Sequence, residues 1–175
     1  MIQKSESIQA ALARKSIAYY LQNRKKLPLP DDLSLEELIG QRAGVFVSLK
    51  KGGRLRGCIG TFLPNKDNIA LEIIENAVSA AIHDPRFFPV TLDELESLSI
   101  SVDILSTPEI VEDTSQLNPR KYGVIVSCGC KKGLLLPDLE GIDTVEQQID
   151  IARQKAGIHV GEDFSIERFK IERYH

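Results

Sequence analysis

The sequence predicts an α+β fold with antiparallel sheets and packed helices. Two pairs of short apolar segments, each joined by a glycine-containing turn, indicate β-hairpins, and hairpin strands pair antiparallel. Longer segments with helical spacing of apolar residues separate these hairpins. The predicted order is helix, hairpin, helix, strand, hairpin, helix, strand, which is typical of an α+β fold and not of a doubly wound one.

The elements of the first half follow from periodicity and from residues that stop helices. The double proline of Leu27–Pro30 ends the first helix, and Asp84-Pro85 ends the second, whose N-cap is Asp67 or Asn68. The expected elements are a helix at 5–24, a connecting segment with a short helical turn at 31–43, a hairpin with strands at 45–49 and 55–59 around a turn at 50–53, and a helix at 68–82.

The second half is predicted from capping patterns and strand alternation. Thr91 with Glu94, and Thr144 with Gln147, fit capping boxes, and Gly157 fits the position after a helix C-terminus. The expected elements are a short helix at 92–97, a strand at 99–105, a hairpin with strands at 124–127 and 134–136 around a turn at 129–133, a helix at 144–156, and a last strand at 164–174.

Composition and charge exclude several classes of protein. The chain has 175 residues, the length of one domain, and 42% hydrophobic and 27% charged residues exclude a disordered or fibrous chain. No apolar run approaches the roughly 20 residues of a membrane span. The formal net charge of −3 disfavours a non-specific nucleic-acid binder, because such proteins are usually basic.

The cysteines and the N-terminus predict a cytoplasmic location. Cys58, Cys128 and Cys130 are an odd number at irregular spacing, which does not fit a disulfide framework and favours a reducing compartment. The first residues contain Glu6 and no apolar run, so no secretory signal is expected.

The stretch Leu55–Gly60 (LRGCIG) is the main candidate site. A glycine inside a strand often marks a bulge or a close backbone approach, so Gly57 and Gly60 are expected to leave the Cys58 thiol and the nearby backbone accessible. The alternative is that Cys58 is a small core residue, because free cysteine is among the most buried residue types.

Strand alternation predicts which side chains share a face with the thiol. A nearby guanidinium favours the thiolate, which is the nucleophilic form of cysteine. The prediction places Arg54, Arg56 and Cys58 on one face, and Leu55, Gly57 and Ile59 on the other.

A second candidate lies at the end of the second predicted helix. His83 is a candidate general base for Cys58, with Asp84 or Asp103 orienting it. The alternative is a histidine that only satisfies a carbonyl at the helix end. Arg86 fits an anion clamp better than a catalytic role, because it is always charged and presents a fork of donors.

The Cys128 and Cys130 pair lies at the second hairpin turn beside Lys131 and Lys132. It supplies two ligands where zinc takes four, so no metal is predicted, and a turn with two incidental thiols is the default interpretation. The sequence contains no P-loop, GxGxxG, HExxH or GxSxG motif, and no cofactor is predicted.

From LRGCIG outward the chain resembles the AMMECR-one family, whose prokaryotic members carry the name AmmeMemoRadiSam system protein A. The resemblance covers nearly the whole chain. It rests on Gly44–Leu49, LRGCIG, Asp84–Phe87, Pro89-Val90, Glu94-Leu95, Leu98–Val102, Leu105–Glu109, Tyr122–Val126, Gly133–Pro137 and Lys155–Gly157.

The resemblance implies one α+β domain over residues 1–175, with a larger and a smaller lobe whose boundary the sequence does not give, and LRGCIG lining the region between them. It implies no established reaction. It does imply a modification pathway shared with Memo-like and radical-SAM partner proteins. The CxC pair departs from the basic hairpin usual in the family, and the tryptophan common after the LLLP stretch is missing.

Three functional hypotheses remain open. The first is an enzyme with Cys58 as nucleophile or covalent carrier and His83 as its base. The second is a non-catalytic module that binds a small anionic ligand or a partner protein. Its ligand-binding residues are Arg54, Arg56, Gly57, Gly60, Asp84 and Arg86. The third is nucleic-acid binding through a local basic patch of Lys50, Lys51, Arg54 and Lys131, which the acidic balance disfavours.

Overall fold

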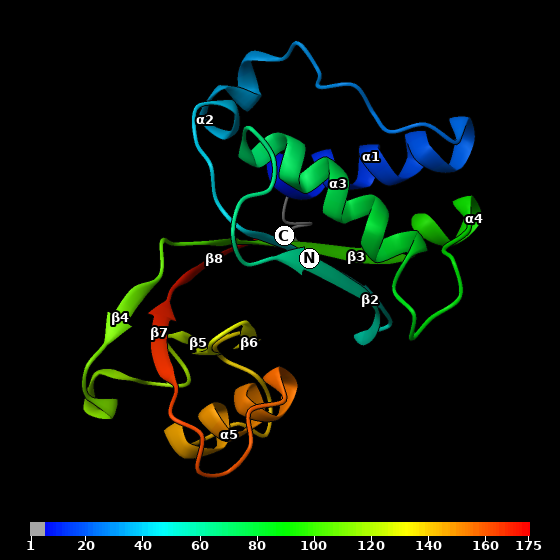
Figure 1. Cartoon of the computed structure of the whole chain (residues 1–175). Helices are drawn as coiled ribbons and strands as arrows, with labels where there is room; N and C mark the ends of the chain where they lie inside the picture. Colours follow the sequence, from blue (N-terminus) through cyan, green and yellow to red (C-terminus); the bar gives the residue numbers. More distant parts are fainter. Residues whose placement is uncertain (1–5) are drawn as a thin grey trace, which may run out of the picture. The chain divides into compact units, whose positions relative to one another are not determined.

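The computed structural model describes residues 6–175 and divides into two compact units (Figure 1). The first unit runs to Ile104 and includes Glu172–His175, and the second spans Leu105–Ile171. The first unit is therefore discontinuous in sequence, because the chain leaves it for the second unit and returns.

The first unit contains four strands and the helices that cover one face of their sheet (Figure 1). The strand order is β2-β1-β3-β8, with β1 antiparallel to both β2 and β3. The elements are α1 Ile8–Asn23, the 3-10 turn η1 Leu33–Leu35, α2 Glu36–Ile39, β1 Val45–Lys51, β2 Arg54–Thr61, α3 Ile69–Ile82, α4 Leu92–Leu95, β3 Leu98–Leu105 and β8 Ile171–Tyr174.

Helix α1 confirms the first predicted helix over the part that the structure describes, while residue 5 lies outside the described residues. Ser7 accepts a hydrogen bond from the Ala10 N–H and so caps the helix. Arg24 ends it in the left-handed conformation and donates its N–H to the Tyr20 carbonyl. In α3, Asn68 and not Asp67 is the cap, accepting from the Leu71 N–H.

Alternating residues of the sheet form the core of the first unit. Val45, Val47 and Leu49 of β1 are buried against the apolar face of α3, and the same core includes Ile100 and Val102 of β3. Helix α3 packs closely on β2 at Gly57, where an added Cβ would overlap the carbonyl oxygen of Ala80. Only glycine allows α3 to approach β2 this closely.

The second unit is a four-stranded sheet of order β4-β7-β5-β6 with one helix packed on it. The neighbouring strands β4 and β7, β7 and β5, and β5 and β6 are antiparallel. Thr144 and Gln147 form the predicted capping box of α5, and Gly157 ends α5 at a φ of 68°. The elements are β4 Glu109–Val111, the 3-10 turn η2 Thr114–Gln116, β5 Gly123–Cys128, β6 Lys131–Leu135, α5 Val145–Ala156 and β7 Ser165–Phe169.

The α+β prediction, with antiparallel sheets and packed helices, is confirmed, whereas three local predictions are wrong and one strand was not predicted. The predicted last strand at 164–174 is two strands, β7 and β8, which belong to different sheets. The turn at 129–133 is only Gly129-Cys130, because Cys128 pairs directly with Lys131. Strand β4 was not predicted, since three residues are too few for a clear alternation. The capping box at Thr91 is absent, because the Glu94 carboxylate binds Arg56 instead.

Candidate active site at Cys58

Cys58 lies on β2, an edge strand of the first sheet, with its backbone N–H and carbonyl directed away from β1. Both groups are satisfied by the loop after α3. The Cys58 N–H donates to Asp84 Oδ2 at 2.9 Å, and Arg86 Nη2 donates to the Cys58 carbonyl oxygen at 3.3 Å. Side chains of the loop therefore occupy the positions that a neighbouring strand would take.

Asp84 and Arg86 also bind each other. Arg86 donates from Nε to Asp84 Oδ1 at 2.9 Å and from Nη2 to Oδ2 at 2.7 Å, a bidentate pair. The hydrogen bonds from Arg86 hold the pKa of Asp84 far below its usual range, and Asp84 raises the pKa of Arg86. We call these two residues the Asp84–Arg86 clamp, because they fix the position of Cys58 on the edge strand.

The Cys58 side chain points to the face of the sheet that the helices do not cover. Its strand neighbours Gly57 and Ile59 pair with Leu49 and Val47, whose side chains are buried in the core. Cys58 therefore lies outside the apolar core and is partly exposed. This position disagrees with the alternative that Cys58 is a core residue.

Two serine hydroxyl side chains lie in line with Cys58 on the same face of the sheet, one on each of the next two strands. Ser48 of β1 pairs with Cys58 and donates its hydroxyl to the Cys58 sulfur at 3.2 Å. Ser48 also pairs with Ser101 of β3 on its other side. The face opposite the helices thus carries a thiol next to a hydroxyl donor. Sequence reasoning missed Ser48, because its strand shows only alternating polar and apolar residues.

Arg56 does not share the thiol's surroundings, which corrects the predicted face assignment. The β1–β2 register shifts between Leu49 and Lys50, so Arg56 is an extra residue in a bulge and the alternation reverses beyond it. Arg54 then pairs with Lys51, on the side of the helices, and Leu55 falls on the side of Cys58.

The Arg56 guanidinium is committed to Glu94 of α4. It donates from Nε and Nη2 to the two carboxylate oxygens, each at 2.9 Å, and these bonds lower the pKa of Glu94. Lys51 donates to the same carboxylate at 3.1 Å. Arg56 Nη1 is buried and has no hydrogen bond within residues 6–175. The predicted anion-binding role of Arg56 therefore competes with an internal carboxylate.

His83 is the C-cap residue of α3, and its side chain is exposed. In the part of the chain that the structure describes, the imidazole makes no hydrogen bond, either to Cys58 or to a carboxylate. Neither predicted orienting group is available, because Asp84 binds Arg86 and Asp103 binds Arg173 at 2.7 and 2.9 Å. The general-base role of His83 stays a prediction.

The remaining predicted site residues either have a packing or ion-pair role or are exposed to solvent. Gly60 faces Phe46 across the strand pair, and a Cβ there would overlap the Phe46 ring. Arg54 is exposed and forms no ion pair with any described residue. Lys131 binds Glu162, which together with the Lys51–Glu94 pair neutralises half of the predicted basic patch.

Cys128 is the last residue of β5, and Cys130 lies in the turn of the second hairpin and is exposed. Among residues 6–175, no group of three or more His, Cys, Asp or Glu side chains is arranged to hold a metal ion. Nor is any helix in this range long and apolar enough to cross a membrane.

Glu72 is a further buried polar residue that sequence reasoning missed, and it shapes the segment after β2. It is 1% exposed and accepts hydrogen bonds from the Thr61 hydroxyl at 2.6 Å and from the Asn65 and Lys66 N–H groups at 2.9 and 2.8 Å. A lone carboxylate within the apolar face of a predicted helix was the available signal.

Comparison with known proteins identifies the family. The AMMECR1 family model matches residues 10–175. This chain belongs to the AMMECR1 family. The resemblance to AMMECR-one proteins is thus confirmed over almost the whole chain.

The relatives are themselves uncharacterised, so the AMMECR1 assignment carries no reaction. A Thermotoga maritima protein is 58% identical over 147 residues, which cover 83% of this chain and 84% of that protein. A Clostridium acetobutylicum protein is 52% identical over 93% of this chain, but the match spans only 35% of that relative. The crystal structure of an uncharacterised Pyrococcus horikoshii protein matches with a TM-score of 0.85 and 32% identity, covering 94% of this chain and 88% of that one.

Proposed function

We propose that this AMMECR1 protein is a cytoplasmic enzyme, or an accessory to one, that uses the Cys58 thiol as nucleophile or covalent carrier in a modification pathway. The observation that carries the proposal is the position of the thiol. It lies on the face of an edge strand opposite the helices, where the Asp84–Arg86 clamp holds the backbone of Cys58 and the Ser48 hydroxyl contacts its sulfur. A reactive group fixed in this way loses little freedom on meeting a substrate.

The contacts of the thiol also suit a positioned nucleophile. The Ser48 hydroxyl donates to the sulfur at 3.2 Å, and the proposal expects this donor to favour the charged form. The Arg86 guanidinium binds the carbonyl of Cys58 and is itself paired with Asp84, so the clamp positions the strand without adding a net charge.

Partner proteins of the Memo-like and radical-SAM types are part of this proposal because of the family resemblance. The Clostridium relative supports the idea of joint action. About two thirds of its length lies outside the segment that matches this chain, so a related domain works there within a larger polypeptide.

The second candidate function is a non-catalytic module that binds an anionic ligand. One observation favours it: the Arg86 side chain is 54% exposed, and its Nη1 forms no hydrogen bond with the described residues. A carboxylate or phosphate at Nη1 would lie beside Cys58. Nucleic-acid binding receives less support, since two of its four predicted cations are paired internally.

The first experiment measures the alkylation rate of each cysteine against pH on the native protein, read by mass spectrometry. Cys58 is expected to react fastest below neutral pH, with Cys128 and Cys130 as internal controls in the same sample. Ser48→Ala removes the hydroxyl donor and is expected to raise the apparent pKa of this reaction by about one unit, while Ser48→Thr restores it.

The proposal fails if Cys58 reacts only after unfolding, or more slowly than both other cysteines over the whole pH range. Unchanged alkylation of Cys58 in Ser48→Ala would leave the thiol reactive but remove Ser48 from its activation. Loss of binding to phosphate in Arg86→Ala, with an inert Cys58, would instead support the binding module.

A further inference from the structure

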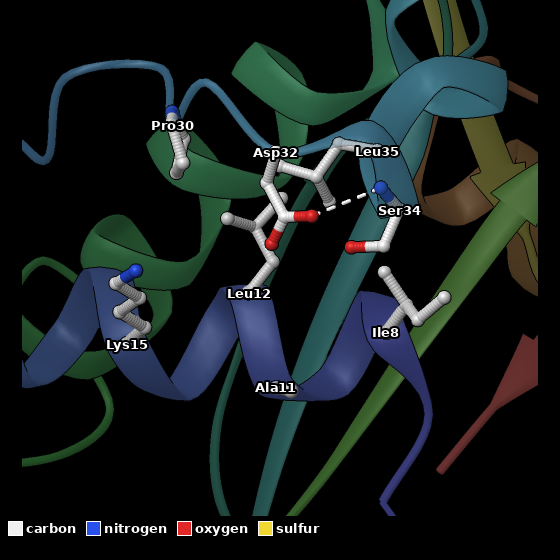
Figure 2. Close-up of a pocket in the computed structure, with 8 residues that line it drawn as sticks. All are labelled: Ile8, Ala11, Leu12, Lys15, Pro30, Asp32, Ser34 and Leu35. Atoms are coloured by element: carbon white, nitrogen blue, oxygen red, sulfur yellow. Dashed lines mark hydrogen bonds between the residues drawn. The ribbon is translucent and has the colours of Figure 1, made fainter.

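A pocket of about 170 Å³ opens in the first unit, and none of the residues of the Cys58 site lines it (Figure 2). It lies between α1 and the segment that leads from α1 to η1. Its lining residues are Ile8, Ala11, Leu12, Lys15, Pro30, Asp32, Ser34 and Leu35.

The walls of the pocket are mostly apolar. Helix α1 supplies Ile8, Ala11 and Leu12 on one side, and Pro30 and Leu35 face them from the other segment (Figure 2). Leu12 and Leu35 belong to the buried core, whereas Ile8 is exposed although it is a large aliphatic side chain. An apolar body placed here would remove the Ile8 surface from water.

A lysine and an aspartate, which carry opposite charges, lie at the edge of this apolar surface. Lys15 extends from α1, and the Asp32 carboxylate extends toward α1 from the facing segment (Figure 2). The Ser34 N–H donates to Asp32 at 2.9 Å, and this bond, with a smaller effect of Lys15, lowers the pKa of Asp32. Among residues 6–175, the Lys15 ammonium forms no hydrogen bond or ion pair.

The size of the pocket limits the ligand. A cavity of about 150 Å³ holds a molecule the size of benzene, whereas sites for nucleotides and drug-sized ligands measure roughly 300–1,000 Å³. The part of the ligand inside this pocket is therefore smaller than a nucleotide and has about a dozen heavy atoms or fewer, while any remainder extends into solvent.

We infer that the pocket binds a small zwitterion with an aliphatic body, which is the chemistry of a free α-amino acid such as leucine. The carboxylate of the ligand pairs with Lys15, its ammonium pairs with Asp32, and its side chain packs on Ile8, Leu12 and Leu35. This site is independent of the Cys58 proposal, since the two share no residue.

The test is an amide NMR titration of the full chain with leucine, compared with two analogues that each lack one charge. 4-Methylpentanoate has no ammonium, and 3-methylbutylamine has no carboxylate. Leucine is expected to give saturable shifts at residues 8–15 and 30–35, with an affinity about tenfold above that of either analogue, because each analogue loses one charge-assisted bond.

Variants assign the charges to residues. Lys15→Met and Asp32→Asn are each expected to weaken leucine binding about tenfold, and Asn keeps an acceptor for the Ser34 N–H. Lys25→Met changes a lysine outside the pocket and is expected to leave binding unchanged. Ala11→Phe fills the pocket and is expected to abolish the shifts at 30–35.

Three outcomes would overturn the inference. Leucine produces no saturable shift, or both analogues bind as tightly as leucine, or Ala11→Phe binds like the unchanged protein while its spectrum shows an intact fold. The second outcome would mean that only the apolar walls of the pocket bind the ligand, and that Lys15 and Asp32 do not contribute.

Discussion

Asp84 uses both carboxylate oxygens on its own chain, accepting from Arg86 and from the Cys58 N–H while only 4% exposed. The clamp therefore holds the site in place and leaves Asp84 no free acceptor for a ligand. Arg86 differs, because one edge of its guanidinium faces solvent. Of the two residues, only Arg86 can both position Cys58 and contact a substrate.

Asp84→Asn is expected to lower the free energy of unfolding at pH 7 by about 2 kcal/mol, with solvent screening of the half-exposed Arg86 limiting the loss. The folded pKa of Asp84 lies below its unfolded value, so its contribution is complete well above about pH 4 and is lost as the pH falls further. Urea unfolding from pH 7 to pH 3 should therefore show a smaller decline in the variant than in the unchanged protein.

Asp163→Asn is the matched control, because Asp163 is exposed and makes no hydrogen bond within the described part of the chain. The free energy of unfolding of Asp163→Asn should change with pH in the same way as that of the unchanged protein. Parallel profiles for Asp84→Asn and the unchanged protein would show that Asp84 does not carry this dependence.

At the scale of elements, the contact between α3 and β2 controls where the edge strand lies. Gly57 touches the Ala80 carbonyl, and the clamp residues come directly after the same helix. Helix α3 therefore fixes Cys58 twice, through its packing on the neighbouring Gly57 and through the loop that it leads into.

Gly57→Ala is expected to destabilise the protein by about 2–3 kcal/mol, because a methyl group there meets backbone that cannot move without shifting α3. Gly40→Ala is the control: its φ is −76° and an added Cβ would lie 3.5 Å from the Glu36 carbonyl oxygen, so the change should be neutral or slightly stabilising. Thermal unfolding measures both. Equal melting temperatures for the two variants would contradict the close contact.

The elements themselves were largely predictable, whereas the contacts of the site were not. Helices α1, α3 and α5 and both hairpins follow from periodicity and capping residues, which are local signals. Gly57 is a weak signal for a bulge nearby, but the residue that bulges, Arg56, depends on how β2 aligns with β1. Glu94 was misassigned for the same reason: its spacing from Thr91 fits a cap, but a distant Arg56 offers a stronger partner.

At the scale of the whole molecule, the sequence did not predict which sheet the C-terminal strand joins. A continuous polar and apolar pattern from Phe164 to Tyr174 gives no sign that the chain changes sheets at Lys170. Strand β8 completes the first sheet and supplies Arg173, which binds the buried Asp103. The first unit therefore depends on residues that follow the second unit in sequence.

Arg173→Ala is expected to cost about 2 kcal/mol, because it leaves the Asp103 carboxylate buried without its guanidinium partner. Hydrogen exchange should show faster exchange in β3 and β8 and unchanged protection in β5 and β7. Arg120→Ala removes two exposed ion pairs of the second unit, with Asp138 and Asp143, and should cost less than about 1 kcal/mol. Uniformly faster exchange in both sheets would contradict a local role of Arg173.

The place of β8 has a consequence during protein synthesis. The ribosome produces β1, β2, α3 and β3 first, yet the outer edge of β3 has no neighbouring strand until the entire second unit has been translated. An uncovered strand edge invites pairing with other chains. The nascent protein therefore passes through a period in which that edge of β3 is unpaired and can pair with other chains.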